Sequence, residues 1–373
     1  MIIDKIDLYL VKNKFYHPWR TAYGSDPGNA VLIVRMASGK FEGWSESSPL
    51  PGPNYCYEYG EGAFNIAKNF LAPAILGKDI ESARQINELM AEYKGNPFAK
   101  GGIEMAWWPL KAEADGVPLW KTLGAKPGKI QVGDGWGIYD DFDTLIEKIG
   151  ASFDDGYTRV KLKMCHGWDY DMLQAVRSVF PTQTIHVDAN SSYRFNDPDD
   201  LALLRSLDKF NLAMIEQPFQ TGDLYHTAKL QAMMDTPLCL DEGVTDVWQA
   251  EEAVEMGACK YINIKPARVG GLQNTIDIAN ICQQAGVGCW IGGMMESDIG
   301  KSMCVAAAAL PNMVYSHDVT PSTINYPELF TDETLVMDKD CCLATSDRIG
   351  NPVKPVMEKM MKKVALEAHL GLE

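Results

Sequence analysis

The chain has 373 residues, nine cysteines and a formal net charge of −16, with 46% hydrophobic and 23% charged residues. This length exceeds what one ordinary domain needs, so we expect a barrel with a smaller domain beside it, and the acidic balance without a basic stripe argues against nucleic acid and anionic membranes as partners. No apolar run reaches the roughly 20 residues of a membrane span and no CxxC pair occurs, so we expect a cytoplasmic protein with reduced cysteines.

The N-terminal part of the chain reads as three strands joined by loops. Residues 2–11 alternate apolar and polar side chains, a second apolar run spans 30–36, and 41–45 would pair back as the third strand after a turn. Between the first two strands lies FYHPWRTAYGSDPG, which is rich in aromatic residues and contains Arg20. We expect a loop here that covers the mouth of a barrel as a lid.

Three helical patterns follow these strands, over residues 57–70, 80–93 and 99–114. Pro109 lies inside the third pattern, and a proline in that position predicts a kink or an early stop of the helix. Three strands followed by helices make a mixed α+β domain, and we place its end at residue 127.

The next part of the chain repeats one pattern at even intervals. KIQVGDGWGIY would supply a first strand, and five apolar segments then carry charged groups at their downstream ends: VKLKM, IHVDAN, MIEQP, LCLDE and INIKPAR. The positions Lys163, Asp188, Glu216, Asp241 and Lys265 are separated by 25, 28, 25 and 24 residues. A period this even indicates one strand and one helix per repeat. The sequence therefore predicts an α/β fold, a TIM-like (β/α)7β barrel over residues 128–320.

Helix starts and the last strands fit the same repeat. Asp197 followed by Pro198 is typical of an N-cap with proline in the first turn. Asp246 with Gln249 resembles a capping box. GCWIGGMMES and VYSHDV would supply the last two strands.

The barrel rhythm stops near Pro321, and residues 355–370 read as an amphipathic helix. We expect residues 321–373 to pack back on the capping domain formed by residues 1–127. No linker indicates an independent third unit.

The strand period of two predicts where the charged side chains meet. Lys161 and Lys163 lie two residues apart, as do Asp188 and Asn190, so each pair leaves its strand on one face. If parallel strands close into a barrel, a charged residue on the inner face is tolerated near the open C-terminal mouth. The acids and lysines would then converge on one pocket.

Three carboxylates at the ends of successive strands, Asp188, Glu216 and Asp241, present oxygen ligands with Asn190 nearby. This set suits Mg²⁺, with Mn²⁺ as a possible substitute, better than zinc, because neither His nor Cys accompanies the acids. A single acid of this kind is often a barrel-mouth charge paired with a lysine. Three on consecutive strands favour a metal site.

Lys163 and Lys265 come from the strands on either side of the acids. A lysine acts as a base when its pKa is brought down from ~10.4 toward neutrality, and nearby cations such as Lys161 and the metal favour this. A lone strand lysine is more often an edge residue with its charge in solvent. Together the groups suit removal of a proton α to a carboxylate, with the metal as Lewis acid for the resulting enolate.

At these residues the sequence resembles the enolase superfamily, and within it the muconate lactonizing subgroup, marked by KxK on the second barrel strand and a lysine on the sixth. Inside that subgroup it is similar to the o-succinylbenzoate synthase and N-acylamino acid racemase family. The similarity is carried by VKLKMCHGWDYDMLQAVRSVFP, VDANSSY, IEQP, PLCLDE, NIKPARVGG, GGMMESDIG, FLAPAILGK and the PxYxxE pattern around Tyr55.

The resemblance implies an enzyme in which Asp188, Glu216 and Asp241 bind Mg²⁺ while Lys163 and Lys265 are the acid/base groups. The first activity it implies is that of a lyase, o-succinylbenzoate synthase, which dehydrates 2-succinyl-6-hydroxy-2,4-cyclohexadiene-1-carboxylate in menaquinone biosynthesis. The alternative is an isomerase, an N-succinylamino acid racemase, or one enzyme with both activities. A dipeptide epimerase or muconate-type cycloisomerase is a remoter alternative.

Further residues are candidates for binding the substrate or supporting the site, and we expect a small carboxylate as substrate and a homo-oligomer. They are Lys161, Asn190, Arg268, Gly293, Met294, Glu296, Arg20 and Tyr55. Arg268 resembles the arginine of family members that racemise N-succinylamino acids, and its alternative is a salt bridge at the strand end. Trp19, Arg20, Gly135 and the AWWPL stretch depart from the family pattern. The pair His317 and Asp318 falls one strand too late for a catalytic dyad, and we interpret it as structural.

Two different classes of function stay open from the residues alone. A strand lysine forms a Schiff base with a ketone in barrel aldolases, which need no metal. A barrel that has lost its chemistry would bind ligands without turnover.

Overall fold

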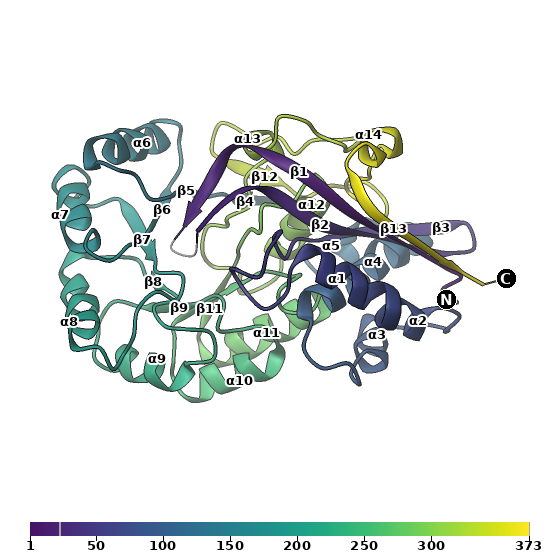
Figure 1. The fold of residues 1–373 in the computed structure, drawn as a ribbon, viewed down its shortest axis with the longest axis horizontal. Coiled ribbons are helices and arrows are strands. Elements are labelled where there is room, and N and C mark those ends of the chain that lie inside the picture. Colours follow the sequence, from purple (N-terminus) through teal and green to yellow (C-terminus); the bar gives the residue numbers. More distant parts are fainter. Residues whose placement is uncertain (22–23, 373) are drawn as a thin grey trace.

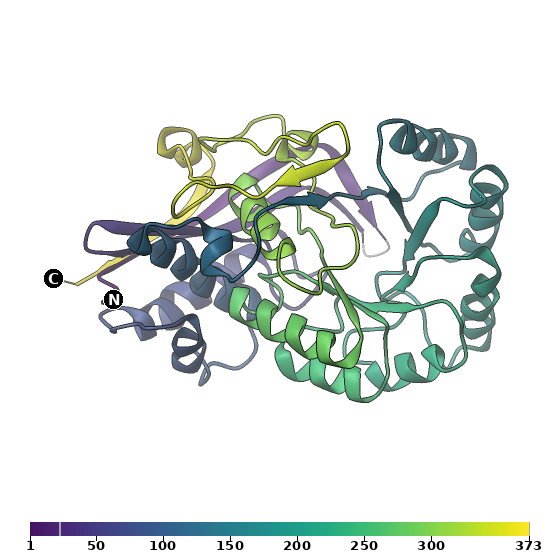
Figure 2. The ribbon, with the colours of Figure 1, turned by 180° about the vertical axis from the view of Figure 1, so that it is seen from behind.

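The computed structural model describes residues 1–21 and 24–372. An antiparallel sheet with helices on one side lies next to a curved sheet of parallel strands that is surrounded by helices (Figure 1). The view from behind shows the same arc of helices outside the parallel strands (Figure 2). The predicted fold class, a TIM-like barrel with an α+β capping domain, is confirmed. Among the helices in the described ranges, none has the length and apolar content of a membrane span.

The capping part is a four-stranded antiparallel sheet in the order β13-β1-β2-β3, with helices after β3. Its strands and helices are β1 (Lys5–Thr21), β2 (Gly24–Ser38), β3 (Phe41–Ser47), α1 (Gly60–Ile66), the π-helical turn η1 (Ala67–Leu71), α2 (Ala72–Ile75), α3 (Ala83–Leu89), α4 (Pro97–Asp115) and α5 (Leu119–Thr122). The three predicted strands and the helical stretches after them are confirmed, with shifted boundaries.

The loop predicted between the first two strands is wrong in most of its length. β1 continues to Thr21 and β2 begins at Gly24, with Trp19 paired to Asp26, so the aromatic stretch forms the outer end of a long hairpin. Ala22 and Tyr23 lie outside the described residues. Cross-strand pairing extends the ladder past the irregularity that follows Lys14, and Figure 1 shows the hairpin reaching toward the barrel strands.

The early stop predicted at Pro109 is also wrong, because α4 runs through it to Asp115. A proline inside a helix costs about 3 kcal/mol through its missing N–H, and packing outweighs that cost here. The helix lies so close to β3 that a Cβ on Gly43 would be 2.2 Å from the carbonyl oxygen of Ala106 and 2.5 Å from the backbone nitrogen of Leu110. Glycine at position 43 makes this approach possible.

The barrel sheet has seven parallel strands in the order β11-β10-β9-β8-β7-β6-β5. Its strands are β5 (Asp134–Trp136), β6 (Arg159–Lys163), β7 (Thr184–Asp188), β8 (Ile215–Glu216), β9 (Leu238–Leu240), β10 (Tyr261–Ile264) and β11 (Gly288–Ile291). The helices of this part are α6 (Phe142–Asp154), α7 (Asp169–Val179), α8 (Pro198–Ser206), the 3-10 turn η2 (Leu207–Phe210), α9 (Leu224–Gln231), α10 (Val247–Glu255), α11 (Leu272–Ala285) and α12 (Asp298–Ala308).

Both ends of the predicted barrel differ from the structure. The first predicted strand divides into β4 (Lys129–Gln131), which pairs with β12 (Cys342–Ala344), and β5, which joins the barrel. The last predicted strand, VYSHDV, forms isolated bridges instead of a regular strand. Its backbone still makes hydrogen bonds to β11 on one side and to residues 131–133 on the other, and these hydrogen bonds close the barrel. The guanidinium of Arg159 binds the carbonyl oxygen of Ser316 at 2.7 Å, an acceptor that a regular strand would use for its ladder.

The helix predicted over residues 355–370 is wrong. A short helix, α14 (Met357–Met361), is followed by β13 (Val364–Gly371), which pairs antiparallel with β1, and α13 (Ser322–Asn325) precedes both. Leu366, Ala368 and Leu370 alternate with polar residues, a period-two pattern that suits the open edge of β1. We propose domain limits near residues 127 and 320, with the last segment joining the capping sheet through β13.

The predicted caps of two barrel helices are present. Asp197 accepts hydrogen bonds from the backbone nitrogens of residues 199 and 200 at the start of α8. Asp246 accepts from the backbone nitrogen of Gln249 at the start of α10. The side-chain oxygen of Gln249 accepts from the backbone nitrogen of Thr245 and not from that of Asp246. The second cap is therefore a capping box shifted by one residue.

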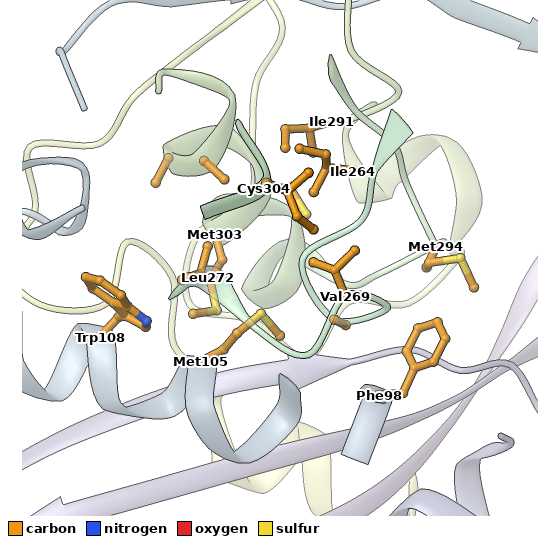
Figure 3. Packing of buried hydrophobic residues seen from close by; sticks show 14 of the residues in the cluster. Phe98, Met105, Trp108, Ile264, Val269, Leu272, Ile291, Met294, Met303 and Cys304 are labelled. Carbon is orange, nitrogen blue, oxygen red and sulfur yellow. The ribbon is translucent and has the colours of Figure 1, made fainter. Parts of the chain in front are cut away.

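One hydrophobic core joins the capping part to the barrel. Figure 3 shows Met105 and Trp108 of α4 near Leu272 and Met303, which begin or lie within barrel helices α11 and α12. All four side chains are buried. Because this core spans both parts, the capping sheet and the barrel hold each other in place.

Buried glutamates from the capping part cap barrel helices. Glu104 of α4 accepts hydrogen bonds from the backbone nitrogens of Leu272 and Gln273, both at 2.8 Å, at the start of α11. Glu46 of β3 does the same at the start of α12, through the backbone nitrogens of Ser297 and Gly300. These carboxylates occupy donors that helix starts leave free, and they fix the two helices relative to the cap.

We expect the stability of the wild type, relative to a Glu104→Gln variant, to fall as the pH rises. Burial raises the pKa of Glu104 to about 7, although Trp108 and two backbone N–H groups bind the carboxylate. A carboxyl whose pKa is raised above the ~4.3 of the unfolded chain contributes most at low pH and loses that contribution as the pH passes its folded pKa. Urea unfolding from about pH 5.5 to about pH 8 should change the difference by about 2 kcal/mol. A pH-independent difference would contradict the prediction.

Candidate active site

The charged residues of the barrel lie at the same end of neighbouring strands. Asp188 ends β7, Glu216 ends β8 and Asp241 directly follows β9. Lys163 ends β6 on one side of this group, and Lys265 directly follows β10 on the other. Since the sheet order is β10-β9-β8-β7-β6, the two lysines flank the three acids, as the sequence predicted.

The three acids form a compact buried cluster. One carboxylate oxygen from each of Asp188, Glu216 and Asp241 lies within 4.8 Å of the other two. One oxygen of Glu216 accepts from Asn263 Nδ2 at 2.6 Å, whereas its Oε2 has longer contacts, 3.4 Å to His186 Nε2 and 3.5 Å to Lys161 Nζ. The cluster therefore includes an oxygen with no short contact.

The charge state of this cluster suits a cation. Burial by itself would raise the pKa of Glu216, but Lys161, His186 and Lys163 hold it well below its usual range, so the carboxylate is ionised. Three buried carboxylates without a histidine or cysteine in the cluster are the hard oxygen donors that Mg²⁺ prefers. The residues present thus fit a divalent metal ion.

Lys163 is held at one wall of the cluster. Its ammonium lies 2.6 Å from Asp188 Oδ2 and donates to Asn190 Oδ1 at 2.8 Å, and Asn190 in turn donates to Glu242 Oε1 at 3.0 Å. Asn190 has a positive φ of 42°, a left-handed conformation that asparagine tolerates better than most residues. This turn places the amide beside the lysine.

Lys265 stands at the opposite wall in a second network. Its ammonium donates to Asp241 Oδ2 at 2.8 Å and to the Tyr55 hydroxyl at 3.0 Å. Arg268 forms an ion pair with Asp241 and donates to the same hydroxyl at 3.2 Å. Arg268 is 1% exposed, so its alternative reading as a salt bridge at the strand end agrees with its contacts. It lies behind the site and positions Asp241 and Tyr55.

Lys161 lies between the acids and Asp318, a residue for which the sequence predicts a structural role. Asp318 forms ion pairs with Lys161 and with Arg159, and it lines the same cavity as the lysines. His317 accepts a hydrogen bond from the backbone nitrogen of Ile291 through Nδ1, which is a structural role. The structural interpretation therefore suits His317, while Asp318 belongs to the charged network of the site.

The surroundings raise, and do not lower, the pKa values of two lysines. Burial disfavours the charged form of Lys161, but the carboxylates of Asp318, Glu216 and Asp188 outweigh it and raise its pKa. The pKa of Lys265 is likewise raised, since Tyr55, Glu242 and Glu216 outweigh burial. The sequence argument for a lowered lysine pKa included the charge of a bound metal, which offsets these carboxylates when it is present.

The lysines open into one cavity of about 500 Å³. The other predicted residues along it are Arg20, Tyr55, Asn190, Gly293, Met294 and Glu296. A Cβ on Gly293 would lie 2.4 Å from the Asp318 carbonyl oxygen, so this position requires glycine. Arg20 is exposed and forms an ion pair with Asp140 at 3.4 Å.

Several residues of the site escaped the sequence reasoning. His186 and Asn263 contact Glu216. His186 lies two positions before Asp188 on β7, and Asn263 of β10 lies two positions before Lys265, which directly follows that strand. The period-two argument that linked Lys161 to Lys163 would have found both, because they share the inner strand face. Asp318 carried no comparable signal, because its segment is not a regular strand.

Comparison with known proteins agrees with this arrangement. Residues 5–124 match the model of the mandelate racemase/muconate lactonizing enzyme N-terminal domain, and residues 144–359 match the enolase C-terminal domain-like model. An N-succinylamino acid racemase from Thermus thermophilus is 34% identical over 94% of both chains. An o-succinylbenzoate synthase from Bacillus subtilis is 35% identical over 87% of both chains.

Solved structures show the same relationship. The structure of an enolase superfamily member from Listeria innocua superposes with a TM-score of 0.95, at 31% identity and with all of both chains covered. The family models and the relatives together cover the capping part and the barrel. The chain therefore belongs to the enolase superfamily, in its o-succinylbenzoate synthase and N-acylamino acid racemase family.

Proposed function

We propose that this enzyme abstracts the proton α to a substrate carboxylate, and that its reaction is the dehydration catalysed by o-succinylbenzoate synthase. The observation that carries the proposal is the placement of two ammonium groups, Lys163 and Lys265, on opposite sides of three buried carboxylates at one cavity. The Bacillus subtilis relative supports the dehydration.

The chain's own residues supply the proton transfers. Lys163, in its neutral form, accepts the α-proton on one side of the substrate, and its contact with Asn190 holds the nitrogen in place. Lys265 faces the other side, where its ammonium stabilises the negative charge that develops in the transition state. Asp188, Glu216 and Asp241 would hold a divalent cation, which when bound supplies a Lewis acid for the substrate carboxylate.

Racemisation of N-succinylamino acids is a second candidate, and the same geometry favours it. If the neutral and charged forms are exchanged between Lys163 and Lys265, one lysine removes the proton and the other returns one from the opposite side. The ion pair of Arg268 with Asp241, and its bond to Tyr55, fix the groups that contact Lys265. The Thermus thermophilus relative supports this activity.

One experiment separates the two activities. The purified enzyme is incubated with Mg²⁺ in D₂O, with a panel of N-succinylamino acids and, in parallel, with the cyclohexadiene carboxylate. We expect an absorbance change from dehydration and deuterium incorporation at Cα of the amino acids. Exchange without dehydration would assign the chain to the racemases, and the absence of both would reject the proposed function.

A further inference from the structure

A buried lysine outside the catalytic group faces the same cavity. Lys301 of α12 is 3% exposed, lines the cavity and donates a hydrogen bond to Asn325 Oδ1 at 2.8 Å. Within the described residues this is its one hydrogen bond, and no carboxylate oxygen lies within ion-pair distance of its ammonium. An ammonium group carries three donors, so Lys301 retains donors that no described residue of the protein occupies.

Asn325, at the end of α13, supplies a second donor. Because an ammonium group donates and never accepts, the amide oxygen of Asn325 faces Lys301, and its amide nitrogen is left without a partner in the described part of the chain. Asn325 also lines the cavity and is half-buried. A positive charge and an amide N–H thus meet at one place on the wall.

The acids near Lys301 accept hydrogen bonds from other groups and form no ion pair with its ammonium, although Asp298 Oδ2 has no hydrogen-bond partner among the described residues. Glu46 accepts from the backbone nitrogens that begin α12, Asp298 accepts from the backbone nitrogen of Ser322 at 3.3 Å, and Glu296 accepts from the backbone nitrogen of Met294 at 3.0 Å. Burial lowers the pKa of Lys301, and these three carboxylates oppose the effect without cancelling it. An anion at this wall would relieve the cost of burying the ammonium.

We propose that Lys301 and Asn325 form the subsite for a second carboxylate of the substrate. This assignment rests on the proposed function, which places the reacting carboxylate at the acids and lysines of the barrel strands. One cavity is lined both by the catalytic lysines and by Lys301 and Asn325, and its volume of about 500 Å³ suits a small molecule with a carboxylate at each end. A succinyl group ends in such a carboxylate. The subsite therefore selects dicarboxylates over monocarboxylates of equal size.

Two compounds of matched size test the subsite. One is an N-succinylamino acid, and the other is its N-succinamoyl analogue, in which a terminal amide replaces the second carboxylate. We expect Lys301→Gln to lower kcat/KM for the succinyl compound by about 10–100-fold, mainly through KM, and to change the value for the succinamoyl compound by less than about threefold. Asn325→Asp should show the same selectivity, because it keeps the acceptor for Lys301 and places a negative charge at the subsite.

The design separates a binding role from a structural one. If Lys301 merely balances the acids around it, Lys301→Gln lowers both values by the same factor and Asn325→Asp changes neither, which would overturn the proposal. Arg20→Gln is the matched control, since Arg20 is another cation on the cavity wall. The proposal would also be overturned if Arg20→Gln lowered kcat/KM for the succinyl compound alone while Lys301→Gln lowered it equally for both compounds. Asn325 is half-buried at a helix end, so its variant keeps the test available if Lys301→Gln fails to fold.

Failure of the proposed function has its own signature. A wild-type enzyme that neither dehydrates the cyclohexadiene carboxylate nor exchanges the α-proton of either compound would reject the function. The subsite is then tested by calorimetric binding of the two compounds in the presence of Mg²⁺. Tighter binding of the succinyl compound, lost in Lys301→Gln and Asn325→Asp, would support the subsite, and equal affinities would reject it.

Discussion

Lys163→Ala is expected to lower the turnover number by about 10³-fold while Mg²⁺ affinity stays within a few-fold of the wild type. The ammonium of Lys163 contacts Asp188 and Asn190, and no other described lysine makes these two hydrogen bonds. Truncation removes the base and leaves the three carboxylates in place. Steady-state kinetics with the dehydration substrate, together with calorimetric titration of Mg²⁺, measures both quantities.

Isotope exchange extends this test to the opposite lysine. If Lys163 and Lys265 serve opposite sides of the substrate, Lys163→Ala should abolish Cα exchange in D₂O for one enantiomer of an N-succinylamino acid, and Lys265→Ala should abolish it for the other. Lys260→Ala is the matched control, because Lys260 precedes β10 at the far end of the barrel. Loss of exchange for the same enantiomer in both variants would contradict the opposed placement.

Chemical trapping, metal removal and the Lys163→Ala variant together separate the proposal from a Schiff-base enzyme and from a barrel without catalytic activity. A Schiff-base mechanism predicts that borohydride traps a substrate adduct on a lysine and that EDTA leaves activity intact. A barrel that binds ligands without chemistry predicts no turnover to lose in Lys163→Ala. Loss of activity with EDTA and its return with Mg²⁺ would exclude both.

The barrel and its charged residues could be predicted from the sequence because each repeat carries its own local signal. An even spacing specifies one strand and one helix per unit, and a period of two places Lys161 with Lys163 on one face. Both rules depend on residues close together in the sequence, so they can be applied without knowing which segments pack against them. The meeting of Asp188, Glu216 and Asp241 at one point, which the structure shows, follows from these two rules.

The failures occurred where distant contacts decide the structure. Residues 364–371 form a strand because β1 offers an open edge, and the outer hairpin stays paired because β1 and β2 support each other beyond Lys14. Pro109 stays helical because α4 is packed on β3. Asp318 enters the site through an irregular segment fixed by Arg159. In each case the segment that decides the structure lies far away in the sequence, and no local pattern predicts the contact with it.

Glu216→Gln is expected to weaken Mg²⁺ binding by at least about 100-fold and to abolish turnover at ordinary metal concentrations. Glutamine keeps an oxygen that can accept from Asn263 Nδ2. It replaces the second carboxylate oxygen, the one that faces Lys161 and His186, by an amide nitrogen, and the side chain loses its negative charge. A cation at the cluster loses one of three anionic ligands. Calorimetric titration with Mg²⁺ measures the affinity directly, independently of activity.

Glu242→Gln provides the matched control for this test. Glu242 is a buried glutamate next to Asp241 that accepts from Asn190, yet it lies outside the cluster of three acids. Its replacement removes a nearby charge without removing a ligand, so we expect Mg²⁺ affinity to change by less than about tenfold, against at least about 100-fold for Glu216→Gln. Equal effects in the two variants would mean that the cation senses the overall charge of the barrel mouth. A larger effect in Glu242→Gln would move the metal site away from Glu216 and remove the reason for placing the substrate carboxylate between Lys163 and Lys265.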